Sequence, residues 1–162
     1  MATKNYRFAE RADIPLIIKF IKDLAHFEHL ESEVTATPEL LEDWLFARKT
    51  AEVVFALDSS GNEVGFALFY HNFSTFLGKG GIHLEDLFVI PEYRKLGYGK
   101  FLLHVLASIA IERKCGRLEL DCLDWNTNAI EFYKKYNPTI MDDWTTYRFT
   151  GDSLQGLADL EV

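Results

Sequence analysis

The sequence has only two cysteines and four prolines, and it has no apolar run long enough to span a membrane. Cys115 and Cys122 lack the spacing of a metal site and suit a reducing cytosol. The N-terminus "MATKNYRFAERAD" lacks the apolar core of a signal peptide. We therefore expect a soluble, cytoplasmic protein that does not bind membranes.

Positive charge is also scarce, because 17 Lys and Arg face 25 Asp and Glu, for a net charge of −8. An acidic protein is a poor partner for nucleic acid or an anionic membrane surface, whereas a small cation is compatible with it. The alternative is that the negative charge serves only solubility. Charge alone does not separate these two interpretations.

The 162 residues, 48% of them hydrophobic, are enough to bury the core of one domain. No repeat, low-complexity tract or linker interrupts the chain, so a single domain over residues 1–162 is predicted. Strands are expected at residues 5–10, 51–58, 63–70, 82–90, 117–123 and 145–149. Helices are expected from Asp13, from Thr37-Pro38, over 97–114 and over 126–136.

This order of elements predicts the fold class. Consecutive strands pair antiparallel first, and the helix between the strands at 82–90 and 117–123 then allows a parallel crossover. We expect an α/β or α+β domain with a mixed central sheet flanked by helices.

The stretch "EYRKLGYGKFLL" places Gly97 and Gly99 where a helix begins. Backbone amides at a helix N-terminus can face an anionic ligand. The Walker pattern would need glycine at Arg94 and Ser or Thr at Phe101, and the dinucleotide pattern would need glycine at Leu102. Neither pattern fits, and the alternative is a loop that only caps a helix.

Arg94-x-x-Gly97-x-Gly99, directly after a strand that ends at Pro91, resembles the pyrophosphate motif of the GCN5-related N-acetyltransferases. The resemblance implies an acetyl-CoA cofactor. No metal is expected, because the cysteines lack metal spacing and the five histidines (His26, His29, His71, His83 and His104) form no metal constellation. The resemblance implies that the backbone of Leu87, Phe88 and Val89 pairs with pantetheine. It also implies that the diphosphate is held at Arg94, Lys95, Leu96, Gly97, Tyr98, Gly99 and Lys100, where Arg94, Lys95 and Lys100 add positive charge.

The segment "LDWNTNAIEFYKKY" places Tyr133 on the sheet-facing stripe of a predicted helix. A tyrosine there is usually a core aromatic. In the resembled family, however, the tyrosine of this Asn-x(6)-Tyr arrangement protonates the departing CoA sulfur. By the same resemblance, Asn126 hydrogen-bonds the pantetheine arm.

The segment "HLEDLFVIPEYR" carries Glu85 and Asp86, which would face opposite sides of a regular strand unless a bulge intervenes. An alkylammonium group has no lone pair, and removing its proton at pH 7 costs about 4.6 kcal/mol. A carboxylate can accept that proton directly or through a water. By resemblance Glu85 is this base, and the alternative is a charged residue on an exposed strand.

Together with "LAHFEHLESEV", these blocks resemble the diamine (spermidine/spermine) acetyltransferases and their thialysine-acetylating relatives over nearly the whole chain. This implies a homodimeric N-acetyltransferase in which a small primary amine (thialysine, a lysine-like compound or a diamine) attacks the thioester directly in a ternary complex. The implied substrate contacts are Glu28, Glu33, Glu85, Asp86 and Phe76. For Glu28 and Glu33 the alternative is a solvated helix end.

The chain departs from polyamine-specific members at "STFLGK" (residues 74–79), where they carry an acidic residue and a tryptophan. Long polyamines are therefore in question. Two rival functions stay open, an acetyltransferase for protein amino groups and a non-catalytic acyl-CoA-binding module. The presence of both Glu85 and Tyr133 argues against the second.

Overall fold

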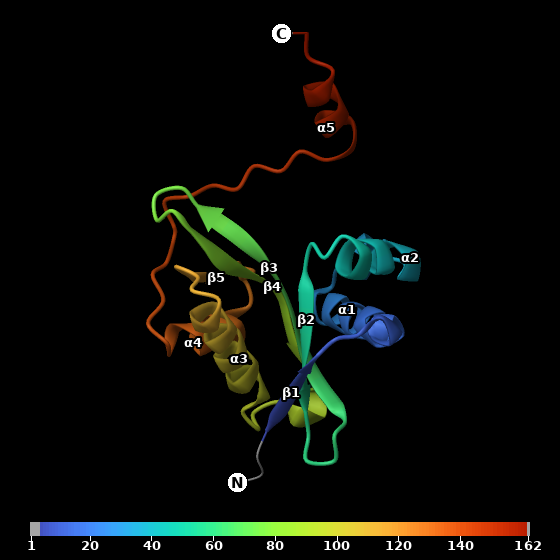
Figure 1. Ribbon diagram of the computed structural model, residues 1–162, viewed down its shortest axis with the longest axis vertical. Helices are drawn as coiled ribbons and strands as arrows, with labels where there is room; N and C mark the ends of the chain where they lie inside the picture. The colour runs from blue at the N-terminus through green and yellow to red at the C-terminus, as the bar shows by residue number, and fades with distance from the viewer. Residues whose placement is uncertain (1–3, 162) are drawn as a thin grey trace. The chain divides into compact units, whose positions relative to one another are not determined.

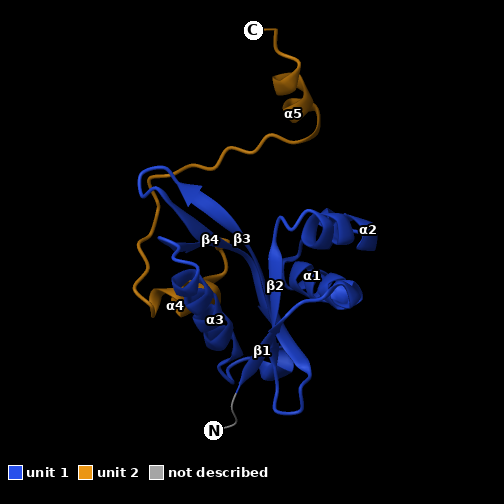
Figure 2. Ribbon diagram, viewed as in Figure 1, with its two compact units in different colours: residues 1–121 blue, residues 122–162 orange. Residues whose placement is uncertain are grey.

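The computed structural model describes residues 4–161 and forms two compact units, residues 1–121 and residues 122–162 (Figure 2). The first unit contains a five-stranded sheet, and the second contains two helices. Along residues 4–161, no helix is both long and apolar enough to cross a membrane.

The sheet of the first unit has its strands in sequence order. The first four pair antiparallel and the fifth lies parallel to the fourth, which confirms the predicted mixed sheet. Its strands are β1 (Asn5–Phe8), β2 (Glu52–Leu57), β3 (Glu63–Ser74), β4 (Lys79–Val89) and β5 (Leu118–Leu120).

Helices lie on both faces of this sheet, with α1 and α2 on one side and α3 on the other (Figure 1). The helix predicted from Thr37-Pro38 is confirmed, and Thr37 caps it, because the Thr37 side chain accepts a hydrogen bond from the Leu40 amide. The helices are α1 (Ile14–Glu28), α2 (Pro38–Leu41), which continues as the π-helix η3 (Glu42–Ala47), and α3 (Tyr98–Glu112), with short 3-10 turns η1 (Arg11–Asp13), η2 (Glu31–Glu33) and η4 (Pro91–Tyr93).

Apolar residues on both faces of the central strands give the first unit two cores. Under α1, Phe20 stacks on Phe66 with ring centroids 5.1 Å apart. Under α3, Leu102 and Leu106 are fully buried against the opposite face. Because both faces are covered, the sheet is a rigid platform for the loops at its ends.

Gly65 in β3 marks a close approach between β3, β4 and α3. A Cβ on Gly65 would lie 2.8 Å from the carbonyl oxygen of Phe88 and 3.1 Å from Cγ2 of Val89. We expect Gly65→Ala to lower the free energy of unfolding by about 2 kcal/mol, measured by urea denaturation. Gly80→Ala is the control, because its Cβ would meet only Asn72 O at 3.7 Å. Equal stability of the two variants would contradict this packing.

The second unit contains α4 (Thr127–Lys134) and α5 (Gly151–Ala158). The helix expected at 126–136 is confirmed, but the strand expected at 145–149 is wrong, because those residues are irregular. A strand forms by pairing, and the second unit offers no other strand along residues 122–161. The helix α5 was not predicted, since Gly151 and Gly156 are poor helix formers.

Candidate functional site

The segment between β4 and α3 presents backbone donors. Lys95 (φ 63°) and Gly97 (φ 86°) both have left-handed backbone, so the chain turns twice before α3 begins. Such turns create a concave set of N–H groups that suits an anion. Gly97 is the N-cap of α3 and provides no side-chain cap. The first amides of α3, from Tyr98 on, therefore have no acceptor within the helix.

Positive side chains surround this bend. Lys95 and Lys100 are exposed beside it. The Nζ of Lys4 lies 5.0 Å from the ring centroid of Tyr98 and 3.8 Å from the point that a Cβ on Gly97 would occupy. Sequence reasoning missed Lys4, because only the placement of β1 brings the residue before it to this bend.

Arg94 and Tyr93 hold the bend in place. The Nε of Arg94 donates to the Val89 carbonyl at 2.9 Å, and its guanidinium lies over the rings of Phe27 and Phe88. The Tyr93 hydroxyl donates to Asp58 at 3.0 Å. Arg94 thus has a structural role here, and its predicted contact with a diphosphate stays a prediction.

Among the described residues, the end of β4 has an edge without a partner strand, although the Val89 carbonyl accepts from Arg94. In the part of the chain that the structure describes, β5 pairs with β4 only at Ile82, His83 and Leu84. Beyond Leu84, this edge of β4 has no partner strand, while the side chains of Phe88 and Val89 are buried in the two cores. An extended ligand could pair with residues 87–89 as another strand would.

A β-bulge changes the predicted orientation of the two carboxylates of β4. Phe69 pairs with Leu84 and Leu68 pairs with Asp86, so Glu85 is the extra residue. Asp86 therefore lies on the same face as Leu68, and Glu85 lies within 3.8 Å of His83 on that face. The expectation that Glu85 and Asp86 face opposite sides holds only for a regular strand.

These carboxylates form an acidic cluster with Glu28 at the end of α1. Burial, and then the charges of Glu85 and Glu28, raise the pKa of Asp86 to about 6. Burial also raises the pKa of Glu28. Three carboxyl groups from two distant segments thus share a half-buried region, which favours a bound cation.

The ionised Asp86 of the acidic cluster lowers the free energy of unfolding, and this effect can be measured. Because the pKa of Asp86 is raised to about 6, its ionised form disfavours the native state, and this cost is absent below about pH 4 and complete above about pH 6. We expect Asp86→Asn to stabilise the protein by about 1–2 kcal/mol near pH 7 and not near pH 4, in thermal unfolding. Asp142→Asn, at an exposed position, should leave the stability unchanged at both pH values. Destabilisation at pH 7 would contradict the cluster.

Two predicted substrate residues lie apart from this cluster. Glu33 is exposed on η2, and Phe76 is 98% exposed in the turn between β3 and β4. Among the described residues, the hydrogen bonds and ion pairs include none from Glu33 or Phe76 to Glu28, Glu85 or Asp86. Their substrate contacts stay predictions.

The second unit carries the two remaining predicted residues. The Asn126 side chain accepts a hydrogen bond from the Ala129 amide at 3.2 Å and so caps α4. Burial, and then the nearby Cys122, raise the pKa of Tyr133 to about 12. The Tyr133 hydroxyl therefore keeps its proton at physiological pH and is available as a donor.

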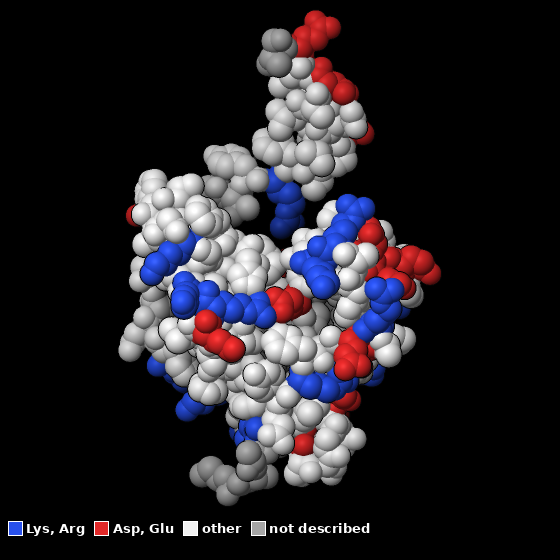
Figure 3. Space-filling model, viewed as in Figure 1, with Lys and Arg blue, Asp and Glu red and all other residues white. Residues whose placement is uncertain are grey.

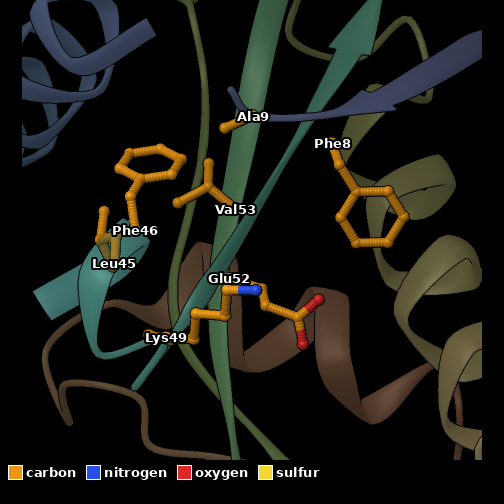
Figure 4. Close-up of a pocket in the computed structure, with 8 residues that line it drawn as sticks. Phe8, Ala9, Leu45, Phe46, Lys49, Glu52 and Val53 are labelled. Carbon is orange, nitrogen blue, oxygen red and sulfur yellow. The ribbon is translucent and has the colours of Figure 1, made fainter. Parts of the chain in front are cut away.

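The first unit also has a cavity beside its second strand. A cavity of about 420 Å³ lies beside β2 and η3 (Figure 4) and contains none of the predicted residues. Most of its lining is apolar, and Glu52 is bonded to Arg113 at 2.8 Å. Figure 3 shows Lys and Arg atoms next to Asp and Glu atoms on the face in view. Ion pairs in the first unit include Arg11–Glu42 and Arg48–Asp43.

The family follows from comparison with known proteins. The model of the acetyltransferase (GNAT) family matches residues 18–137, which include the bend, the acidic cluster and Tyr133. The chain belongs to the acetyltransferase (GNAT) family. It is an N-acetyltransferase, as the resemblance implied.

Two curated GNAT relatives match over almost their full length. The chain is 32% identical to the thialysine N-epsilon-acetyltransferase of Mus musculus, covering 98% of this chain and 99% of the relative. It is 31% identical to the L-ornithine N5-acetyltransferase NATA1 of Arabidopsis thaliana, covering 96% and 88%. Among solved structures, an integron cassette protein from the mobile metagenome of V. cholerae has a TM-score of 0.79 at 26% identity, covering 99% of each chain.

Proposed function

We propose that this GNAT acetyltransferase transfers an acetyl group from acetyl-CoA to the primary amine of a small cationic molecule, such as thialysine or a lysine-like diamino acid. The observation that carries the proposal is that β4 joins an acidic cluster at Glu85 and Asp86 to the bend after Pro91, where Lys95 and Gly97 have left-handed backbone. The free edge at residues 87–89 lies between them.

The residues of the first unit suit acetyl-CoA. The amides of residues 95–100 and the nearby Lys4, Lys95 and Lys100 would hold its diphosphate, and residues 87–89 would pair with its pantetheine arm. Acetyl-CoA supplies the acetyl group as a thioester. Binding energy at the diphosphate, far from the reacting atoms, helps to position that group.

In this proposal the carboxylates bind and deprotonate the amine, and Tyr133 donates a proton. Glu28 and Asp86 attract the ammonium group, and Glu85 accepts the proton that the amine must lose before it attacks. Tyr133 gives a proton to the departing sulfur, and Asn126 contacts the pantetheine arm. In this proposal the two units act as one domain, in a cytoplasmic homodimer, with Glu33 and Phe76 at the substrate.

A coupled CoA-release assay with a panel of amines tests the function. We expect turnover with thialysine, ornithine and lysine to exceed turnover with spermidine, since residues 74–79 carry no carboxylate for a second distant ammonium group. A lysine-containing peptide tests the rival protein substrate. No turnover with any amine or peptide would contradict the proposal and favour a binding module.

A further inference from the structure

His83 occupies a fixed position on the face of the sheet that carries the acidic cluster. It pairs across the sheet with Tyr70 of β3 and Glu119 of β5. Its ring stacks on Tyr70 with centroids 5.0 Å apart and an interplanar angle of 27°. Only 16% of the His83 side chain is exposed. The imidazole is therefore held in one place rather than free in solvent.

The Nε2 atom of His83 lies between two carboxylates. It is 3.8 Å from Oε2 of Glu85 and 3.9 Å from Oδ2 of Asp121. These distances are too long for direct hydrogen bonds, but a water can bridge them. The Glu85 side chain is 55% exposed and that of Asp121 is 91% exposed, so the three groups lead from the acidic cluster toward solvent.

The other titratable groups near His83 have partners of their own or stay protonated. Glu119 accepts from Asn72 at 2.7 Å and pairs with Arg117 at 2.8 Å. Burial, and then Glu85, Asp121 and Glu119, raise the pKa of the Tyr70 hydroxyl, which therefore stays protonated. Glu28 and Asp86 lie beyond Glu85 in the acidic cluster. Glu85 and Asp121 are thus the carboxylates closest to Nε2.

The reaction creates a need for a proton exit. An ammonium group that becomes an amide loses two N–H protons, one of which restores the proton that Tyr133 gives to the sulfur. The other proton must leave the site. Imidazole can both accept and release a proton near neutral pH, which a carboxylate or an ammonium group does less readily.

We propose that His83 relays this proton from Glu85 to solvent, an inference that rests on the proposed function. The ammonium N–H bond breaks and an O–H bond forms on Glu85. That proton then moves through a water to Nε2 of the imidazole, and it leaves to water beside Asp121. His83 acts through Glu85 and is a positioning residue rather than a group that touches the substrate.

Two variants test the relay in the pH dependence of turnover. His83→Phe keeps an aromatic ring against Tyr70, and His83→Gln keeps a polar side chain, but neither can carry the proton. We expect kcat near pH 8 to fall about tenfold or more in both, with the KM for acetyl-CoA unchanged. The shape of the pH profile of kcat/KM should differ from that of the wild type in both variants.

Controls separate His83 from the other groups. His104→Gln, at an exposed position of α3, should leave rate and pH profile unchanged. Asp86→Asn removes a carboxyl group whose pKa is raised to about 6, and adding His83→Gln to that variant should still change its pH profile. Wild-type pH profiles in both His83 variants would overturn the relay while the acetyltransferase function stands. Absence of turnover in the wild type would instead overturn the proposed function, and the relay with it.

An NMR titration of the wild-type protein tests the relay even if the His83 variants do not fold. In NMR titration with thialysine, we expect the His83 ring signals to move and the His104 signals to stay. Glu85→Gln should abolish the movement, because the relay reaches the amine through that carboxylate. His83 signals that do not respond to the amine would overturn the relay.

Discussion

Tyr133→Phe is expected to lower kcat about 100- to 1000-fold while the affinity for acetyl-CoA stays nearly unchanged. The substitution removes the hydroxyl group and leaves the ring, so α4 should fold normally. A thiolate leaves more easily when a donor protonates it, since a free thiol has a pKa of about 8.5. Stopped-flow measurement of CoA release, together with calorimetric titration of acetyl-CoA, separates the two effects.

The pKa of Tyr133, raised to about 12, makes this prediction sharper. The hydroxyl remains protonated through the whole working range, so its ionisation should not appear in the pH profile below about pH 11. Tyr136→Phe is the matched control, because Tyr136 lies one turn further on and its side chain is 43% exposed. A Tyr133→Phe enzyme as fast as the wild type across pH would show that Tyr133 is not the acid.

Glu85→Gln is expected to lower kcat/KM for the amine about 100-fold near pH 7, with little change for acetyl-CoA. The amide cannot accept the ammonium proton at ordinary pH. The deficit should shrink for an amine of low pKa, which already has a free lone pair near pH 8. Steady-state kinetics with two amines of different pKa measure this dependence.

Glu92→Gln is the control for Glu85→Gln. Glu92 is exposed on η4, and its neutralisation changes the net charge by the same amount without touching the acidic cluster. We expect it to leave kcat/KM nearly unchanged. An equal deficit for both amines in Glu85→Gln would indicate that Glu85 serves substrate binding rather than proton removal.

The parts of the fold that depend on local pattern were predictable from the sequence. Alternating apolar residues located the strands from β1 to β5, and Gly97 located the bend before α3. The motif also identified the family that the comparisons show. These features follow from side-chain periodicity and from the backbone freedom of glycine, and both can be read from the local sequence.

The features that depend on distant partners were not predictable. The bulge at Glu85 exists because β3 pairs with β4 in a shifted register, which no local pattern encodes. Lys4 reaches the bend and His83 meets Tyr70 and Asp121 only because β1, β3 and β5 lie where they do. The expected strand at 145–149 had the right pattern but lacks a partner within the second unit.

The central claim is that the bend at residues 95–100 binds the diphosphate of acetyl-CoA, and calorimetric titration of two glycine variants with acetyl-CoA tests it. Gly97 and Gly61 both have φ 86°, so Gly97→Val and Gly61→Val impose similar backbone strain, but Gly61 lies in the turn between β2 and β3. We expect the wild type and Gly61→Val to bind acetyl-CoA and Gly97→Val to bind at least about tenfold more weakly. No binding by the wild type, or equal binding by all three proteins, would contradict the account.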